Sequence, residues 1–374
     1  MEYIMLKDVC DINMGQSPDS SSYNDDGNGL PFFQGNADFG ERYPVTRKWC
    51  SVPTKIAKPE DILISVRAPI GALNYAREKC CIGRGLAALT PDKSKVSPEF
   101  IFWLLKAKNI ELNNKGTGST FKAIGRNVLE ETQVPNVPLT VQLEYSQVLE
   151  RIYAIIQSRK MQLQKLDNLV KARFVELFGE PRSNPFEYPK TMLKNSCKVV
   201  TGNTPSRTVA EYYGDYVEWI KTDNIVPGVL NPTKAAEYLS EKGMVAGRTV
   251  DKGSVLMACI AGSVASIGRV CITDRKVAFN QQINAIIPEK YNTLFLYILL
   301  QMSKDYLIED INMSLKGILS KSKLEGKEFI IPPVELQNQF AAFVTQADKS
   351  KAVIQKALDK AQLLFDSLMQ RYFS

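Results

Sequence analysis

The chain has 374 residues, a net charge of +7 and 44% hydrophobic residues, and it contains seven cysteines but no histidine. Its length exceeds what one hydrophobic core usually organises, so two or three domains are expected. The missing histidine excludes Ser-His-Asp and Cys-His catalysis and histidine-ligated metals. The basic balance permits a polyanionic partner without requiring one.

The N-terminal sequence MEYIMLKDVCDI lacks the basic and apolar regions of a secretory signal. The most hydrophobic runs, at 100–105 and 294–300, are shorter than a membrane span. The cysteines form no CxxC pairs, which favours reduced thiols over a disulfide framework or a zinc site. Together these features predict a cytoplasmic protein with no membrane partner.

The sequence contains an internal duplication. LKDVCDINMGQSP at 6–18 returns as LKNSCKVVTGNTP at 193–205, an offset of 193 − 6 = 187 residues, which is half of 374. The parallel continues through strand-like runs at 61–71 and 254–268, polar segments leading into strands at 83–91 and 280–288, and short apolar helices at 99–105 and 294–300. Two copies of one mixed α/β domain are therefore predicted, at 1–138 and 180–333.

Each copy is followed by a long helix, predicted at 139–179 and 334–374. Pro135 and Pro138 precede the first helix, and Gly179 and Pro181 end it. Apolar and small residues recur at steps of three and four. They are Leu143, Val148, Ile152, Ile155, Leu163, Leu166, Val170, Phe174 and Leu177 in the first helix, and Leu336, Phe340, Phe343, Ala347, Ser350, Ile354, Ala357, Ala361, Leu364 and Leu368 in the second. The fold class is therefore α/β (α+β), with two tandem domains separated by two long antiparallel coiled-coil helices.

Catalytic signatures are missing from the sequence. GTGST at 116–120 lacks the ending and spacing of a Walker loop, and no G-x-S-x-G elbow occurs. Asn184-Pro185-Phe186 lacks the second proline of an amino-methyltransferase motif, and no glycine-rich cofactor loop lies near it. We therefore predict a non-catalytic protein that has no metal or cofactor site of its own.

Polar, glycine-rich and basic turns recur at matching positions of both copies. Hydroxyls, backbone N–H groups and lysines suit phosphate oxygens, and Gln, Asn and Arg suit base edges. The candidates for DNA binding are Gln34, Asn36, Arg67, Arg84, Lys115, Thr117, Ser119, Thr120 and Lys122 in the first copy, and Lys221, Thr222, Asp223, Asn224, Asn280, Gln281, Gln282, Lys316, Lys321 and Lys323 in the second. Each cluster alone is typical of a solvated loop, but their recurrence in register favours DNA binding for the set.

Over essentially its whole length the chain resembles the specificity (S) subunit of type I restriction–modification systems. The resemblance rests on the tandem repeat, on the Leu-Lys-x-x-Cys-x-x-x-x-Gly-x-x-Pro opening of each half, on P-L/V-x-x-Q at the start of each long helix, and on ARFVELFGEP at 172–181. It implies two target-recognition domains that each read one half of a bipartite double-stranded DNA sequence. The helices would fix the gap between the half-sites.

The resemblance also implies partners. The helices would dock two methyltransferase (M) subunits, with restriction/translocase (R) subunits as possible additions. S-adenosylmethionine, ATP and Mg would then bind only to those partner subunits, and this chain would carry no cofactor. Because the two copies differ at nearly every candidate position, we expect an asymmetric target.

The alternative interpretation is a non-catalytic coiled-coil adapter or scaffold whose two heads bind protein or carbohydrate. It explains the helices and the missing catalytic motifs equally well, but it explains the basic balance and the paired polar loops less well. DNA affinity measured against salt concentration distinguishes the two, because phosphate contacts weaken steeply as salt rises.

Overall fold

The computed structural model describes residues 2–118, 122–309, 311 and 317–373. The chain divides into two compact units, residues 1–160 with 355–374 and residues 161–354. Each unit consists of an α/β head and parts of two long helices. We call the described residues between 2 and 138 head 1, and those between 180 and 333 head 2. Because both units include parts of both helices, the domain boundaries predicted from the sequence stay a prediction.

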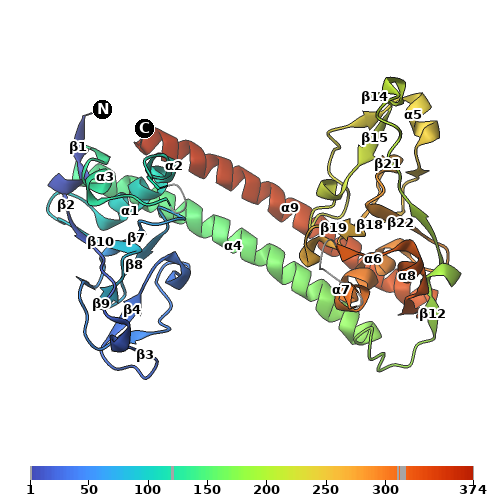
Figure 1. The fold of residues 1–374 in the computed structure, drawn as a ribbon, viewed down its shortest axis with the longest axis horizontal. Coiled ribbons are helices and arrows are strands. Elements are labelled where there is room, and N and C mark those ends of the chain that lie inside the picture. Colours follow the sequence, from blue (N-terminus) through green and yellow to red (C-terminus); the bar gives the residue numbers. More distant parts are fainter. Residues whose placement is uncertain (1, 119–121, 310, 312–316, 374) are drawn as a thin grey trace. The chain divides into compact units, whose positions relative to one another are not determined.

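Head 1 is built from short strands and helices (Figure 1). Its strands are β1 (Tyr3–Met5), β2 (Cys10–Met14), β3 (Tyr23–Asn24), β4 (Leu30–Phe33), β5 (Trp49–Cys50), β6 (Ile56–Ala57), β7 (Ile62–Ser65), β8 (Leu73–Tyr75), β9 (Cys80–Ile82), β10 (Leu86–Pro91) and β11 (Gln133–Pro135). Its α-helices are α1 (Pro98–Ala107), α2 (Asn109–Asn114) and α3 (Arg126–Glu130). The long helix α4 (Leu139–Phe178) follows.

Head 2 follows the same order with two additional strands, β19 (Ile260–Ala261) and β23 (Gly317–Ile318), and one additional helix, α5 (Glu241–Ala246), among its described residues. Its strands are β12 (Lys190–Met192), β13 (Cys197–Thr201), β14 (Tyr213–Gly214), β15 (Val217–Ile220), β16 (Tyr238–Leu239), β17 (Thr249–Val250), β18 (Val255–Ala258), β19 (Ile260–Ala261), β20 (Val270–Ile272), β21 (Val277–Phe279), β22 (Ile283–Pro288), β23 (Gly317–Ile318) and β24 (Glu328–Ile330). Its α-helices are α5 (Glu241–Ala246), α6 (Thr293–Met302), α7 (Lys304–Ile308) and α8 (Lys321–Gly326). The second long helix, α9 (Val334–Phe373), ends the chain's described part.

The two heads share one sheet topology. Within the described residues, head 1 has a four-stranded sheet in the order β2-β10-β7-β8 and a five-stranded sheet in the order β3-β5-β4-β9-β6. Head 2 has the same two sheets in the orders β13-β22-β18-β20 and β14-β16-β15-β21-β17. The pair β4 and β9 is parallel in head 1, as is its counterpart β15 and β21 in head 2. The internal duplication predicted from the sequence is confirmed.

The repeated opening motif is structural. Leu6 and Leu193 are fully buried, and their backbone N–H groups donate to the carbonyls of Thr132 and Lys327, each at 2.9 Å. The motif cysteines, Cys10 and Cys197, are also buried at the first position of β2 and β13. The shared residues therefore mark core positions that begin each sheet.

A glutamine fixes the start of each long helix. The Gln142 side chain accepts the Ser97 N–H at 2.9 Å and donates to the Val137 carbonyl at 2.9 Å. In head 2, Gln337 accepts the Asn292 N–H at 2.9 Å and donates to a carbonyl at 2.8 Å. Ser97 and Asn292 are the N-caps of the buried helices α1 and α6. The glutamine of the P-L/V-x-x-Q motif therefore ties each long helix to its head.

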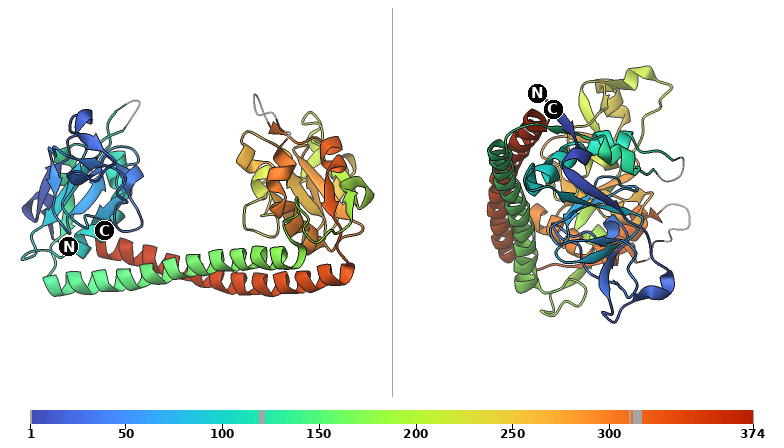
Figure 2. Two further views of the ribbon diagram at one scale, coloured as in Figure 1. Left: turned by 90° about the horizontal axis from the view of Figure 1, so that it is seen from below. Right: turned by 90° about the vertical axis from the view of Figure 1, so that its left-hand side faces the viewer.

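The long helices pair antiparallel within each unit. In unit 1, Tyr145 of α4 stacks on Tyr372 of α9, with 3.8 Å between the ring centroids, and Tyr153 of α4 lies 6.2 Å from the Phe365 ring of α9. In unit 2, Asp167 of α4 pairs with Lys351 of α9 at 2.6 Å, and the Phe174 ring packs on Phe340 at 5.6 Å. Later residues of α4 thus meet earlier residues of α9, and Figure 2 shows the two helices side by side. The antiparallel pair predicted from the sequence is confirmed.

In the part of the helices that packs on head 1, the predicted apolar stripes are right at Ile152, which is buried, and wrong at three other positions. Leu143, Ile155 and Leu364 are exposed at 42%, 50% and 51% of their surface. Most of the other buried positions there lie one residue away from a predicted position. They are Gln142, Leu149, Ile156, Leu358, Phe365 and Met369, and Ser146 and Phe373 are buried as well. The physical reason is that these turns face both a partner helix and head 1, so the buried face is not the narrow seam of a two-helix coiled coil.

None of the helices within residues 2–118, 122–309 and 317–373 combines the length and the hydrophobicity that a membrane span requires.

Candidate nucleic-acid interface

The polar candidates of head 1 gather where three strands end. Because β4 and β9 are parallel, their carboxyl ends meet, and Gln34 follows β4 while Arg84 follows β9. The segment after β2 joins them, since the Gln16 N–H donates to the Ile82 carbonyl at 3.0 Å. We call residues 15–20, 34–36 and 83–85 the loop edge of head 1. The corresponding loop edge of head 2 is residues 202–207, 221–224 and 280–282.

A glycine lets the loops of each edge approach closely. A Cβ atom on Gly15 would lie 2.2 Å from the Gly83 carbonyl oxygen. In head 2, a Cβ atom on Gly202 would lie 2.1 Å from the Asn280 carbonyl oxygen. The glycine of the repeated opening motif is therefore needed for backbone packing beneath the loop edge in both heads.

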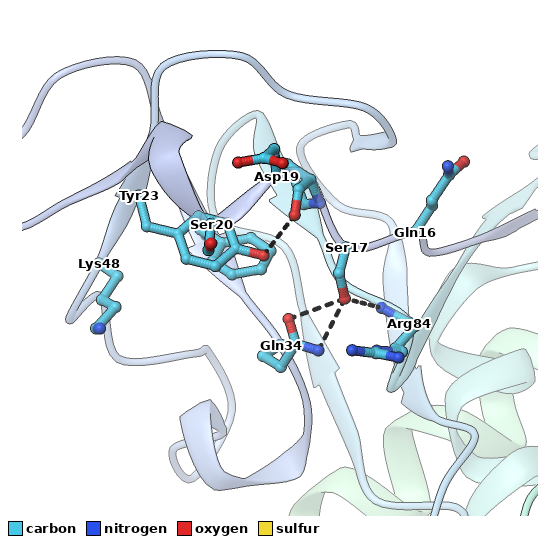
Figure 3. A pocket seen from close by; sticks show the side chains of 10 residues that line it. Gln16, Ser17, Asp19, Ser20, Tyr23, Gln34, Lys48 and Arg84 are labelled. Atoms are coloured by element: carbon cyan, nitrogen blue, oxygen red, sulfur yellow. Dashed lines mark hydrogen bonds between the residues drawn. The ribbon is translucent and has the colours of Figure 1, made fainter.

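An open pocket of about 750 Å³ lies at the loop edge of head 1 (Figure 3). The Tyr23 and Phe32 rings stack at 4.6 Å between centroids and line it. The Tyr23 hydroxyl donates to the Pro18 carbonyl at 2.9 Å, and desolvation raises the pKa of this phenol. Figure 3 shows Gln34 and Arg84 on one side of the Tyr23 ring and Lys48 on the other. The pocket combines an apolar wall with amide and cationic groups.

Ser17 links the three loops of this edge. Its hydroxyl oxygen accepts the Gln34 Nε2–H at 2.9 Å and the backbone N–H of Arg84 at 3.3 Å. The carboxylate of Asp38 accepts the backbone N–H of Gln34 at 2.7 Å. The Gln34 amide and the Arg84 backbone are thereby held in place, while the Gln34 and Arg84 residues remain exposed.

A second set of candidates joins the same region through the backbone. The Val66 N–H donates to the Gly85 carbonyl at 2.9 Å, which places Arg67 next to the loop edge. Arg67 forms an isolated bridge with Ala123, and Ala123 forms another with Thr117. The Ala68 N–H donates to the carbonyl of Lys122 at 3.0 Å. Backbone contacts therefore bring Arg67, Thr117 and Lys122 together, and the Val66 N–H joins this segment to Gly85, which follows Arg84.

The loop edge of head 2 repeats the hydroxyl–amide link with other residues. The Thr204 hydroxyl donates to the Gln281 side-chain oxygen. Asn280 is buried, and its amide donates to Gln282 Oε1 at 3.1 Å while its oxygen accepts the backbone N–H of Gln282 at 3.1 Å. Of the predicted Asn-Gln-Gln run, Gln281 is exposed, Gln282 is half-buried and Asn280 holds the turn.

A cluster of two cations, one carboxylate and two aromatic rings stands at the edge of head 2. The Arg207 guanidinium lies over the Tyr213 and Trp219 rings, at 4.5 and 5.3 Å from their centroids. Lys221 Nζ lies 5.0 Å from the Trp219 centroid. Glu237 pairs with both cations, with Arg207 at 2.6 Å and with Lys221. Hydrogen bonds from Lys221 and Arg207 lower the pKa of the Glu237 carboxyl, which keeps it ionised.

The remaining predicted residues have other places. The Lys115 side chain pairs with the Glu111 carboxylate at 2.8 Å. Glu111 lies on α2, and Lys115 is the residue that directly follows this helix. The amide of Asn224 is buried and caps the 3₁₀ turn η6 (Thr222–Asn224) by accepting the backbone N–H of Lys221 at 2.9 Å. Lys321 and Lys323 lie on α8, which packs against β13 and the turn η4 (Leu193–Asn195). Asn36, Thr222 and Asp223 lie on the loop edges. Ser119, Thr120 and Lys316 lie outside the described residues.

Sequence reasoning missed several side chains at these edges. They are Gln16, Ser17, Tyr23 and Lys48 in head 1, and Thr204, Arg207, Tyr213 and Glu237 in head 2. The duplication itself holds a signal for some of them, because Gln16, Ser17 and Thr204 lie inside the repeated opening motif and Arg207 follows its proline by two residues. Lys48 and Glu237 carry no such signal, since only strand pairing brings them to the edge.

Comparisons with known proteins agree with this architecture. The family model for the "Type I restriction modification DNA specificity domain" matches residues 1–168 and 187–362. The type I restriction enzyme MjaIX specificity subunit of Methanocaldococcus jannaschii is 24% identical to this chain, and the match covers 98% of this chain and 91% of the relative's length. The putative MjaX specificity subunit of the same organism is 42% identical over 160 residues, and this match spans 43% of the chain and only 38% of the relative. The EcoBI specificity subunit of Escherichia coli is 20% identical over 99% of the chain and 85% of its own length.

A solved structure shows the same fold. The crystal structure of the type I restriction–modification S subunit from M. genitalium matches 100% of this chain and 96% of that one, with a TM-score of 0.65 and 13% identity. The chain belongs to the family of type I restriction–modification DNA specificity subunits. Recognition of a DNA sequence is accordingly the function that its fold and relatives support.

Proposed function

We propose that each head reads one half of a bipartite, asymmetric DNA sequence through its loop edge. The observation that carries this proposal is the recurrence of one backbone arrangement with different polar side chains. Ser17, Gln34 and Arg84 stand in head 1 where Thr204, Lys221 and Gln281 stand in head 2. Arg, Gln and Lys side chains donate to base edges and phosphates, and different sets select different bases.

The basic segment beside the edge of head 1 supports backbone contacts. Arg67 and Lys122 are exposed and adjacent through the bridge at Ala123. Cations that neutralise phosphates give affinity without sequence preference, and they orient the domain on the duplex. In this proposal Arg67 and Lys122 position head 1, while Gln34 and Arg84 read bases.

The helices are proposed to serve the other subunits of a restriction–modification complex. Large apolar side chains lie exposed along α4 and α9 within the described residues. They include Leu143, Ile155, Met161, Leu169, Val353, Leu363 and Leu364. Where exposed apolar side chains form a contiguous surface, that surface is typical of protein–protein contact sites. We propose that it docks two methyltransferase subunits, with restriction subunits added in the complete complex, and that the helix pair fixes the spacing of the half-sites.

In this proposal the chain itself catalyses no reaction. S-adenosylmethionine, ATP and Mg would bind to the partner subunits, and the complex would act on DNA in the cytoplasm. The division is supported by the sequence, which lacks histidine and a glycine-rich cofactor loop.

Methylome sequencing tests the proposal directly. A host that carries this chain with its methyltransferase subunit is expected to show DNA methylation at an interrupted, non-palindromic motif. A purified complex should bind that motif with an affinity that falls steeply as salt rises. A palindromic motif would contradict the asymmetric reading. Absence of salt-dependent DNA binding would favour the adapter interpretation instead.

A further inference from the structure

Lys48 in head 1 and Glu237 in head 2 occupy the same backbone position. The Lys48 carbonyl accepts the Phe32 N–H at 2.9 Å, and the Glu237 carbonyl accepts the Trp219 N–H at 3.0 Å. Each residue directly precedes a two-residue strand, β5 or β16, that pairs with β4 or β15. One head therefore presents a cation where the other presents a carboxylate.

The neighbours of this position differ in a concerted way. Arg207 follows the motif proline of head 2 by two residues, and Ser20 holds that place in head 1. Lys221 follows β15, where Gln34 follows β4 in head 1. Head 2 thus combines two cations with one carboxylate, whereas head 1 combines uncharged Ser20 and Gln34 with the cation Lys48.

A carboxylate at a DNA-binding edge repels phosphates, so its presence needs a reason other than affinity. Glu237 is placed to orient Arg207. Its Oε2 accepts from Arg207 Nη2 at 2.6 Å and its Oε1 accepts from Lys221 Nζ, while the guanidinium packs over Tyr213 and Trp219. A planar guanidinium fixed by ring contacts and by a carboxylate keeps one orientation.

The side chain of Arg207 still has donors to offer. It is 58% exposed, and its only guanidinium hydrogen bond seen among the described residues is the one to Glu237. A guanidinium carries five N–H donors, and the commonest specific contact to DNA is bidentate donation from Arg to O6 and N7 of guanine. At the loop edge, the cluster therefore presents the Arg207 guanidinium in a fixed orientation, with N–H donors that are available to a ligand.

We propose that Glu237 is a specificity-determining positioning residue, which holds Arg207 to read a guanine in the half-site of head 2. This inference rests on the proposed function, because it assumes that the loop edge contacts DNA. It adds the base that head 2 reads, the side chain that reads it, and the residue that fixes that side chain. Head 1 lacks the arrangement and reads its half-site by other groups.

The test compares Glu237→Gln with Glu211→Gln in the full chain, purified with its methyltransferase subunits. Glu211 forms a highly exposed pair with Lys242 at 2.6 Å in the same head, so both substitutions remove one ion-paired carboxylate, although Glu237 pairs with two cations and Glu211 with one. Binding is measured on the methylated motif identified in the host and on duplexes with each base pair of both half-sites replaced. Salt is varied in every series.

Glu237→Gln is expected to lower discrimination at one guanine of one half-site by about tenfold or more, the factor that a lost bidentate contact produces. Affinity for unrelated duplex should stay equal or become tighter in both variants, because each loses one negative charge. Glu211→Gln should keep full discrimination at every position. Arg207→Lys, which keeps the charge but not the fork of donors, should lose discrimination at the same guanine.

Three results would overturn the inference. They are equal behaviour of Glu237→Gln and Glu211→Gln, an equal loss of discrimination in both half-sites, and full discrimination by Arg207→Lys. Folding is checked by thermal unfolding of each variant, and Arg207→Lys gives a second reading if Glu237→Gln is unstable. A wild-type complex that prefers no sequence would contradict the proposed function itself, which is a different outcome from a wild type that discriminates without using Glu237.

Discussion

The two heads have the same backbone frame and different chemistry on its edge. Gly15 and Gly202 make the same close approach, and Tyr23 and Tyr213 both donate to the carbonyl of the motif proline, at 2.9 and 2.7 Å. Beside these constant features, Lys48 is exchanged for Glu237. Since the frame is held by backbone hydrogen bonds and core packing, the edge side chains can change without altering the fold.

The heads also differ where they meet the long helices. In unit 1, the Trp103 ring packs edge-on against Tyr153 of α4 and Phe365 of α9, at 5.4 and 5.5 Å. In unit 2, Phe174 of α4 packs between Phe295 and Phe340, at 5.8 and 5.6 Å. The second junction is fully buried and purely hydrocarbon, whereas Tyr153 is only half-buried. We therefore expect the second junction to be more sensitive to truncation.

Phe174→Ala should have the largest effect on stability. Removing a fully buried phenylalanine ring is expected to lower the free energy of unfolding by about 3–5 kcal/mol. Tyr153→Ala should cost about half as much, because part of its ring stays in water. Urea denaturation of both variants measures the difference. Leu169→Ala, at a position of α4 that is 50% exposed, is the matched control and should change the free energy by about 0.5 kcal/mol or less.

Substitution of the opening-motif glycine should lower the stability of both heads to the same extent. Gly15→Ala and Gly202→Ala would push a Cβ atom against a carbonyl oxygen, so each is expected to cost about 1–3 kcal/mol. Gly35→Ala is the control, since no atom lies within 4 Å of its Cβ position. Thermal unfolding measures all three. If Gly15→Ala lowered the thermal unfolding temperature and Gly202→Ala left it unchanged, the backbone frames of the two heads would not be equivalent.

The smallest expected effect concerns a clamp between head 1 and α4 that has no counterpart among the described residues of head 2. Arg42 pairs with Glu150 of α4 at 2.7 Å and lies over the Tyr75 ring at 5.2 Å. Leu230 takes the place of Arg42 in head 2, because the carbonyls of both accept the N–H of an equivalent strand residue, Tyr75 or Ile272. Arg42→Ala should cost about 1 kcal/mol, since the pair is partly exposed and is screened by solvent.

Salt dependence distinguishes the contribution of the Arg42–Glu150 ion pair from that of apolar packing. The cost of Arg42→Ala should shrink at 1 M salt, whereas the cost of Leu230→Ala should not, because only the first removes an ion pair. A double-mutant cycle of Arg42→Ala with Glu150→Ala should give a coupling free energy above zero. A coupling of zero would show that Arg42 acts through its ring contacts alone.

The fold could be predicted because its signals are repeated. The two copies of the opening motif, the buried runs that became α1 and α6, and the proline and glycine limits of α4 all lie in continuous segments. Which face of each long helix is buried could not be predicted in full. Leu143 and Leu364 follow the apolar period, yet burial at their turns goes to Gln142 and Phe365, because head 1 covers a face that the period alone does not reveal.

The site was predicted only where loops follow strands in sequence. Gln34 and Lys221 lie directly after strands, Arg84 and Gln281 lie two residues after strands, and all four were among the candidates predicted from the sequence. Lys48 and Glu237 reach the edge through pairing with strands far along the chain, so local sequence gives no sign of them. Whether the predicted residues contact DNA stays a prediction.

The composition of the first compact unit has a consequence for synthesis of the chain. Phe365 and Phe373 pack on Trp103 and Phe100 of head 1, although more than two hundred residues of sequence separate them. While a ribosome is still translating head 2, the first head would expose the Trp103 and Phe100 side chains, because α9 has not yet been made. A product released before α9 is made would therefore lack the rings of Phe365 and Phe373 that pack on Trp103 and Phe100, and its first head would have an incomplete core.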